Sequence, residues 1–360
     1  MTALALPRAV LRQARVVADV FSVDAAEILA GRAGMLGIAP CEQVSAGGAT
    51  RLLAARDGWG ALTLSRADDI AAVPALLGVD AVEDPWVALA EWAAAHDAAD
   101  LADRARLLGI PAAVLGETPA APVHVRPRGA RLARPLGGLL VADLSSMWAG
   151  PLCGHLLARA GATVVKVESP VRPDGTRAGL PAFFDWMNSG KLSYAVSFDD
   201  PGLAALLAAA DVVIEASRPA ALERRGLGPD SVTPQAGQVW LRITGHGAHG
   251  ERAQWVAFGD DAAVSGGLVE YHDDAPIFVG DAIADPLTGL EAARAVSAAL
   301  AAGGGELIEI SMAAVAATYA ALPDEGQVSV SALPMTSPAA PSLGADNVAV
   351  ERLVAERASC

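Results

Sequence analysis

The second half of the chain alternates short apolar runs with helix-like segments, and this alternation constrains the fold more than any other feature. Between Leu136 and Met312 six runs are almost continuously apolar and resemble buried strands: LGGLLVADL, TVVKVE, KLSYAVSF, DVVIEAS, QVWLRITG and ELIEISM. Alanine-rich helical patterns separate them, and the last begins at Pro286 and ends at about Ala301. Strands that are apolar on both faces and joined by helices form a parallel sheet covered on both sides. We therefore predict an α/β fold with a Rossmann-like, mostly parallel sheet and helices on both faces.

The pattern also divides the chain into parts. We predict a small α+β domain at 1–117, a linker at 118–135, a large domain at 136–321, and a tail at 322–360 that returns to the large domain. In the first part, an Asp-Gly turn predicts a hairpin over Arg51–Arg66. Asp84 followed by Pro85 predicts the start of a single helix that ends near Gly109. The linker is rich in proline and arginine, which break periodicity.

Charge and cysteine content exclude several classes of partner. The net charge is −15, and an anionic surface repels nucleic acid and anionic lipid, so neither is expected as a partner. No segment reaches the roughly 18 unbroken apolar residues of a membrane span. The three cysteines are widely spaced, without CxxC or Cys/His ligand spacing, and no secretory segment is apparent. We therefore predict reduced thiols, a cytoplasmic protein and no metal site.

The segment from Val141 to Pro170 imitates a dinucleotide-binding unit. It contains a strand, a tight loop, a helix and a second strand ending in Glu168, where such units place a ribose-binding acid. However, the loop SSMWAGP lacks the glycines that let a backbone approach a pyrophosphate, so we expect no NAD. The chain's two lysines, Lys166 and Lys191, lie close together here, whereas arginine is used elsewhere. A compact ammonium is not replaceable by a guanidinium in a tight site, which predicts constrained positions for both.

Seven segments between about Leu136 and Ala321 resemble the class III coenzyme A transferases, in the order and spacing of that family. They are GLLVADLSSMWAGPLCGHLLARAGATVVKVESP, DGTR, MNSGKLSYAVSF, ADVVIEASRPAALERRGLGP, LRITGHGAHGER, GDAIADPLTG and ELIEISM. The family includes formyl-CoA transferase, the carnitine CoA-transferases and the α-methylacyl-CoA racemases. The resemblance implies coenzyme A bound as acyl-CoA, a carboxylic acid acceptor and a homodimer. DGWGALTL and GIPAAVL resemble pieces of the family's small domain. In this chain they precede the segment that contains the family's AGP motif (Ala149–Pro151), which indicates a permuted-like order of the same parts.

The resemblance implies that Asp285 is the catalytic residue. The family's aspartate lies in a motif like G-x-x-x-x-D-x-x-x-G, which is GDAIADPLTG here. Such a carboxylate attacks a thioester to form a mixed anhydride and then carries coenzyme A as a thioester of its own side chain. Asp followed by Pro before a helix is also an ordinary N-cap with proline at the first helical position. The two readings are compatible, because a helix N-terminus stabilises the charged form, so we expect an ionised cap.

The resemblance further implies contacts to coenzyme A. Four loop residues match the segment that lines the coenzyme A channel: Ser146, Met147, Trp148 and Ala149. Trp148 could stack on adenine, wall the acyl site or fill a domain interface. Four basic residues are candidates for the nucleotide part, where local arginines must offset the acidic field: Arg177, Lys191, Arg218 and Arg224. Each arginine could instead be a solvated surface residue.

Two other functions remain open beside coenzyme A transfer. An α-methylacyl-CoA racemase needs two bases, and the family's racemases use a histidine in a GHD-type motif. The corresponding AFGDDAAVSGG has Asp260 and Asp261 but no histidine, while His246 and His249 lie about a dozen residues upstream. A homologue that binds acyl-CoA without turnover is the third possibility. We favour an acyl-CoA:carboxylate coenzyme A transferase, without support for formyl or oxalate specificity.

Overall fold

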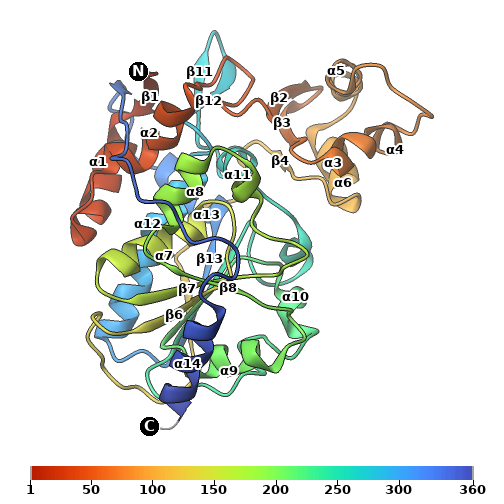
Figure 1. Cartoon of the computed structure of the whole chain (residues 1–360). Coiled ribbons are helices and arrows are strands. Elements are labelled where there is room, and N and C mark those ends of the chain that lie inside the picture. Colours follow the sequence, from red (N-terminus) through yellow and green to blue (C-terminus); the bar gives the residue numbers. More distant parts are fainter. Residues whose placement is uncertain (1, 359–360) are drawn as a thin grey trace.

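A seven-stranded sheet forms the centre of the protein, in the order β5-β13-β10-β9-β6-β7-β8 (Figure 1). The computed structural model describes residues 2–358. The parallel strands are β6 (Leu140–Asp143), β7 (Thr163–Glu168), β8 (Leu192–Ala195), β9 (Val212–Glu215), β10 (Val239–Thr244) and β13 (Glu306–Ser311). The edge strand β5 (His124–Pro127) is antiparallel to β13. All six predicted strands are confirmed, in the order of a doubly wound fold.

Alternate residues of β6, β7, β9, β10 and β13 face two separate apolar cores. Val141 and Leu241 face one core, whereas Leu140 and Trp240 face the other. The first core is covered by α7 (Ala149–Arg159), α12 (Ala284–Ala301) and α13 (Met312–Ala320). The second is covered by α9 (Pro201–Ala209), α10 (Pro219–Glu223) and α14 (Asn347–Ala358). Both faces of the sheet are therefore buried, as the continuous apolar runs predict.

The strand order places a topological switch point between β6 and β9. From β6 the chain proceeds to β7 and β8 on one side, and from β9 to β10 and β13 on the other. Open α/β sheets bind ligands in the crevice outside the carboxyl ends of the strands at such a point. The loop 144–148 follows β6, and the segment 216–218 follows β9. Helix α12 runs into the parallel strand β13, so its N-terminus lies at the same edge of the sheet.

A smaller unit projects from the large one (orange in Figure 1). It consists of β2 (Thr50–Ala55), β3 (Gly58–Thr63), β4 (Ala112–Val114), α3 (Ala67–Ala71), α4 (Val73–Leu77), α5 (Pro85–Ala95) and α6 (Ala98–Leu107), around its own core. The predicted hairpin and the Asp84 cap are confirmed. The single helix expected up to Gly109 is wrong: His96 is extended (φ −126°, ψ 167°), and the Asp57 side chain accepts the backbone N–H of Ala98 at 2.8 Å, where α6 begins.

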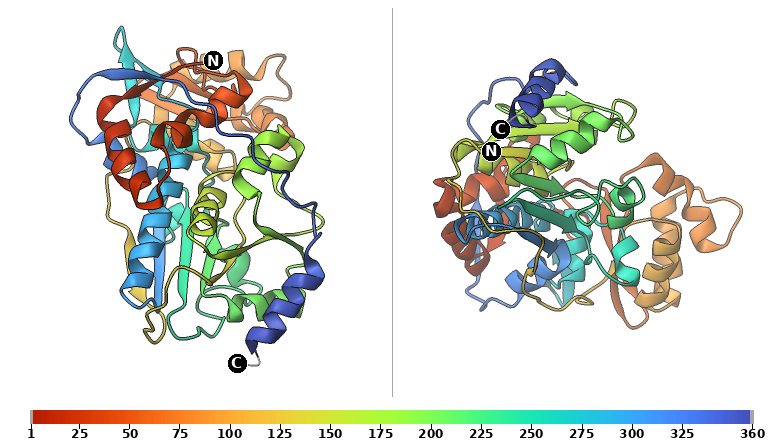
Figure 2. Two further views of the ribbon diagram at one scale, coloured as in Figure 1. Left: turned by 60° about the vertical axis from the view of Figure 1, so that its left-hand side comes forward. Right: turned by 90° about the horizontal axis from the view of Figure 1, so that it is seen from below.

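The N-terminal segment departs from the predicted division of the chain. β1 (Leu4–Pro7), α1 (Arg8–Ala18) and α2 (Ala25–Leu36) contribute to the large core rather than to the small one. β1 pairs antiparallel with β14 (Gln327–Val330), and the tail then runs along the outside of the molecule to α14 (Figure 2). Helix α14 packs on α9 and β8. The tail therefore returns to the large domain, and the expected linker contains the edge strand β5.

The remaining elements lie around the carboxyl edge. They are α8 (Pro181–Asn188), α11 (Gly259–Ser265) and the hairpin β11 (Val269–His272) with β12 (Ala275–Phe278). Short 3-10 turns are η1 (Asp19–Phe21), η2 (Gly175–Ala178) and η3 (Glu251–Gln254). Cys41 and Cys153 are free thiols, and Cys360 lies outside the described residues. None of the helices in the described residues 2–358 combines the length and the apolar character that crossing a membrane requires.

Candidate active site

Asp285 lies in the first turn of α12 rather than at its cap. The chain turns at Ala282, whose φ is +42°, and Ile283 already has helical geometry, so α12 begins at Ala284. The backbone N–H of Asp285 donates to the carbonyl of Ala282 at 2.8 Å. The prediction of an N-cap is therefore wrong by two positions, because Ile283 caps the helix. Pro286 is still tolerated, since the first-turn N–H groups lack intrahelical partners.

The carboxylate of Asp285 lies where three helices begin. Backbone N–H groups of Ala149, at the start of α7, and of Gly259, at the start of α11, donate to it. A side chain at position 259 could not fit, because its Cβ would meet Asp285 Oδ2 at 2.5 Å and the Ala282 carbonyl at 2.2 Å. Helix N-termini favour negative charge, so this arrangement is an anion-stabilising one.

Burial opposes that stabilisation. Asp285 is only 9% exposed, and burial, with the nearby charge of Asp260, raises the pKa of Asp285 to about 7. The N–H groups of Ala149 and Gly259 and the charge of Arg32 act in the opposite direction. The expectation of a fully ionised carboxylate is therefore wrong near neutral pH, where the charged and neutral forms coexist. A carboxyl whose pKa lies near 7 can act both as a nucleophile and as a proton carrier.

Three further acids lie on or next to α11 and α12, and the charge of one of them, Asp260, acts on Asp285. Burial raises the pKa of Asp260 to about 6 and that of Asp261 to about 8. Asp281 is buried as well, and its Oδ1 accepts Arg32 Nη1 at 2.5 Å. The Arg32 guanidinium, from α2, also lies 5.5 Å from the ring centroid of Trp148. Sequence reasoning missed Arg32, because an arginine in a distant N-terminal helix carries no local signal for this site.

The two lysines shape the loop between β6 and α7. Lys166 donates to the carbonyl of Ser145 and, at 2.8 Å, to Asp174, whose carboxylate also accepts the Met147 N–H at 3.2 Å. From the other side, Lys191 donates at 2.9 Å to Asp143, which accepts the Ser145 N–H at 3.1 Å. Both ammonium groups are buried. The prediction that the lysines occupy constrained positions is therefore confirmed.

The structure does not support Lys191 as a contact to coenzyme A. Its three hydrogens are accepted by Asp143, by the carbonyl of Pro151 at 2.9 Å and by the side chain of Asn188 at 3.1 Å. Burial alone would raise the pKa of Asp143, but the ammonium groups of Lys191 and Lys166 bring it below its usual range. Lys191 therefore holds the loop from within and has no donor left for a ligand.

The loop residues divide between a buried wall and an exposed rim. Ser146 and Met147 are exposed, and Met147 has φ +72°, a left-handed conformation that is rare for a side chain of this size. Trp148 is 3% exposed and packs edge-to-face on Phe183, with ring centroids 5.3 Å apart. Trp148 therefore forms a wall beside Asp285 and is not placed to stack on adenine. Ala149 contributes its backbone N–H to the carboxylate.

The three predicted arginines differ in their surroundings. Arg177 is 19% exposed; it binds Glu168 at 2.6 Å and lies 4.2 Å from the ring centroid of Phe184. Its donors are therefore largely used by the protein. Arg218 and Arg224 flank α10 and are both exposed, and their side chains have no hydrogen-bonding partner among residues 2–358. These two arginines are the ones available to an anionic ligand near the switch point.

Neither predicted histidine contacts Asp285 in the described part of the chain. His246 is buried against Trp255, with ring centroids 5.3 Å apart, and burial lowers its pKa to about 3, so it is neutral. His249 pairs with Glu309 at 3.0 Å. The second base that a histidine-dependent racemase needs is therefore not placed at this site.

Comparison with known proteins agrees with the geometry. The family described as CoA-transferase family III matches residues 136–326. Succinate–glutarate CoA-transferase of Agrobacterium fabrum is 33% identical over 191 residues, covering 46% of this chain and 47% of that protein. Human succinyl-CoA:glutarate CoA-transferase is 32% identical over 182 residues, covering 46% and 42%. Formyl-CoA:oxalate CoA-transferase of Afipia carboxidovorans is 28% identical over 183 residues, covering 47% and 43%.

The family model and the curated relatives each match about half of this chain. A CAIB/BAIF family protein from Brucella suis has a solved structure that matches with 31% identity and a TM-score of 0.47, over 52% of this chain and 56% of that one. The chain spans about half the length of the curated relatives it matches. The family match nevertheless covers more than half of the 360 residues and includes the whole segment from β6 to α13. The chain therefore belongs to CoA-transferase family III.

Proposed function

We propose that this chain transfers coenzyme A from an acyl-CoA to a free carboxylic acid, with Asp285 as the nucleophile. The observation that carries the proposal is the position of the Asp285 carboxylate at the meeting point of α7, α11 and α12, with the N–H groups of Ala149 and Gly259 directed at it. The family membership and the relatives that bear the names of CoA-transferases support the same reaction class.

The reaction proceeds by exchange of acyl groups on one side chain. A carboxylate oxygen of Asp285 attacks the thioester carbon of the acyl-CoA. The carbon–sulfur bond then breaks, which releases the coenzyme A thiolate and forms a mixed anhydride between the acyl group and Asp285. The thiolate then attacks the side-chain carbonyl carbon of Asp285, which releases the donor acid and forms an aspartyl-CoA thioester. An acceptor carboxylate then attacks the aspartyl-CoA thioester, which releases the thiolate and forms a second mixed anhydride. The thiolate attacks the acceptor's carbonyl carbon, which forms the new acyl-CoA and restores the carboxylate of Asp285. The N–H groups of Ala149 and Gly259 would stabilise the negative charge that develops on the Asp285 oxygens.

The switch point provides the binding surface for the nucleotide part. Ser146 and Met147 are exposed after β6, and Arg218 and Arg224 are exposed after β9. Coenzyme A carries several phosphates, and the chain has a net charge of −15, so unpaired guanidinium groups at the crevice would provide the local positive charge. We assign these four residues to coenzyme A binding and leave Lys191 and Arg177 to structural roles.

Access to Asp285 requires a movement. The side chain is 9% exposed, and Arg32 of α2 links the N-terminal segment to Asp281, four residues before Asp285. A pantetheine arm would reach the carboxylate when this Arg32–Asp281 contact opens. The homodimer expected from the family remains a prediction, and light scattering of the purified chain tests it.

Mass spectrometry of the intact protein tests the proposal. The chain is incubated with a panel of acyl-CoAs, and the expected result is a mass increase equal to coenzyme A less one water on the peptide that contains Asp285. Asp285→Asn is the matched control, because it keeps the shape of the side chain and removes the nucleophile; circular dichroism confirms that it folds. An adduct that persists in Asp285→Asn contradicts the assignment. Deuterium uptake at the α-carbon of a chiral 2-methylacyl-CoA in heavy water, without coenzyme A transfer, would instead show a racemase.

A further inference from the structure

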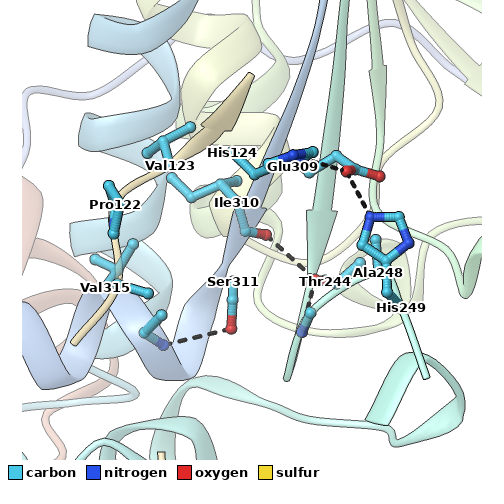
Figure 3. A pocket seen from close by; sticks show the side chains of 13 residues that line it. Pro122, Val123, His124, Thr244, Ala248, His249, Glu309, Ile310, Ser311 and Val315 are labelled. Carbon is cyan, nitrogen blue, oxygen red and sulfur yellow. Dashed lines mark hydrogen bonds and ion pairs between the residues drawn. The ribbon is translucent and has the colours of Figure 1, made fainter. Parts of the chain in front are cut away.

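A cluster of two histidines and one glutamate lies at the β5 edge of the sheet. His124 Nδ1 and His249 Nε2 both contact the same oxygen, Oε2 of Glu309, at 2.9 and 3.0 Å. One ligand atom from each residue lies within 4.8 Å of the others. Figure 3 shows His124 and His249 beside Glu309. The three residues line a cavity of about 150 Å³, together with Ser311 and Thr244.

The sheet itself brings these residues together. Glu309 lies on β13, opposite His124 of the antiparallel edge strand β5 and opposite Arg242 of the parallel strand β10. His249 follows β10 in the loop beyond its carboxyl end. The three residues lie far apart in sequence, so no local spacing predicted a metal site. Their convergence depends on β5 pairing with β13, which the sequence did not predict either.

The charges around Glu309 leave it suited to a cation. A row of acidic and basic side chains crosses neighbouring strands from Glu215 to Arg242 to Glu309. Arg242 is 4% exposed and contacts both glutamates as well as Glu223. One guanidinium is therefore shared by three carboxylates. Among residues 2–358, His124 and His249 are the side chains that contact Glu309 Oε2.

We propose that His124, His249 and Glu309 bind a divalent transition metal ion of the Zn²⁺ class. Two imidazole nitrogens and one carboxylate oxygen are a ligand set that zinc takes, with an open fourth position for water or a ligand. Metal–ligand bonds of about 2.0–2.2 Å place the ligand atoms of one tetrahedron roughly 3.3–3.6 Å apart. The two contacts to Oε2 need to open by only about half an ångström to admit an ion of this size.

The side chains around the cluster hold the proposed metal ligand Glu309 in a fixed orientation. Arg242 Nη1 contacts the other oxygen of Glu309 at 3.4 Å and so orients the carboxylate from outside, as outer partners do in metal sites. The side chain of Glu309 is 6% exposed, whereas those of His124 and His249 are 60% and 73% exposed, so the open position faces solvent. A bound ion would join the crossing segment 118–135 to the core strand β13 and to the loop after β10. We therefore assign it a clamping role that is independent of Asp285.

Metal titration of the untagged, full-length chain tests the site. The protein is dialysed against a chelator and titrated with Zn²⁺ by calorimetry near neutral pH, and Co²⁺ is then substituted to report coordination by visible absorption. We expect one ion per chain, a Co²⁺ spectrum of tetrahedral or five-coordinate type, and a higher melting temperature with Zn²⁺. His124→Ala and His249→Ala are each expected to weaken binding about tenfold or more, because even loss of an outer partner has an effect of that size.

The controls separate this site from other ligands. His272→Ala removes an exposed histidine on β11 and should leave the affinity unchanged. Cys41→Ser and Cys360→Ser together should also leave it unchanged, which excludes thiol ligands. Both cluster histidines are exposed, so their variants are expected to fold. Absence of Zn²⁺ binding by the wild type, or equal affinity of the wild type and both cluster variants, would overturn the proposal and leave two hydrogen-bonded histidines.

Discussion

The pKa of Asp285 leads to a quantitative prediction for the pH dependence of adduct formation. Burial and the charge of Asp260 raise that pKa to about 7. Only the ionised form attacks the thioester, so the rate rises with pH through about 7 and then levels off. Asp260→Asn removes the second cause of the shift while its remaining oxygen can still accept the Ala282 N–H, which Asp260 Oδ1 accepts at 3.0 Å. The variant should therefore move the midpoint of the profile to lower pH.

The magnitude follows from the ionised fraction of Asp285. With a pKa of about 7, roughly one side chain in eleven is ionised at about pH 6 and roughly ten in eleven at about pH 8. The rate constant for adduct formation by the wild type should therefore increase about tenfold over this interval. In Asp260→Asn the increase should be smaller than tenfold, and at about pH 6 the variant should be faster than the wild type.

Single-turnover measurements provide the assay. The protein in excess is mixed with an acyl-CoA, quenched at intervals, and the adduct on the Asp285 peptide is quantified by mass spectrometry across the pH range. Asp273→Asn, in the exposed turn between β11 and β12, is the matched control and should reproduce the wild-type profile. A rate that is flat between about pH 6 and 8, or an Asp260→Asn midpoint at or above that of the wild type, would refute the assignment of a raised pKa to the nucleophile.

Three further predictions concern stability and binding. Burial raises the pKa of Asp261 to about 8, so between about pH 5 and 7 the folded state keeps a proton that the unfolded chain releases. The free energy of unfolding of the wild type should therefore fall by roughly 1.4 kcal/mol for each unit of rising pH in this range. Urea titration should show that this contribution is absent in Asp261→Asn. Lys191→Ala leaves the carboxylate of Asp143, 2.9 Å away, buried and without its ammonium partner. The free energy of unfolding should therefore fall by about 3–5 kcal/mol in the same measurement. An unchanged urea concentration at the midpoint of unfolding would contradict the structural role of the pair. Arg224→Ala should weaken coenzyme A binding roughly tenfold at low salt by calorimetry, whereas Arg8→Ala, at an exposed arginine of α1, should not; equal affinities would remove Arg224 from the site.

The large domain was predictable because its strands are buried on both faces. Apolar runs such as that from Leu140 to Asp143 have no polar alternation, which leaves a covered parallel sheet as the arrangement that buries them. The division of the chain was less predictable. Helix α1 is amphipathic, and its buried side includes Val10 and Val17, but amphipathicity does not reveal which of two cores a helix joins. The break at His96 was missed because the contact that starts α6 comes from Asp57, a distant residue.

The candidate site was predictable only where a motif stays within one segment. Asp285 and the loop 144–148 each lie in short continuous stretches, and the structure brings them together through the Ala149 N–H. Arg32 joins the site from a helix far away in the chain, 249 residues before its partner Asp281, and this contact depends on the order of the parts. The ionisation of Asp285 was misjudged for the same reason, because the burial that raises its pKa comes from neighbours elsewhere in the chain.

The two lysines connect the sequence pattern to the chemistry. A Cβ at Gly154 of α7 would lie 2.8 Å from Asp143 Oδ2 and 3.1 Å from Lys191 Nζ, so the space beneath the helix admits a compact ammonium and little else. Arginine is larger and planar, and its five donors could not all be satisfied there. Asp143 in turn accepts the backbone N–H of Ser145. Loss of the Lys191–Asp143 pair would therefore displace the loop that leads into Ala149, whose N–H bonds to the carboxylate of Asp285. Lysine is thus retained in an arginine-using chain because the position of one backbone N–H at Asp285 depends on it.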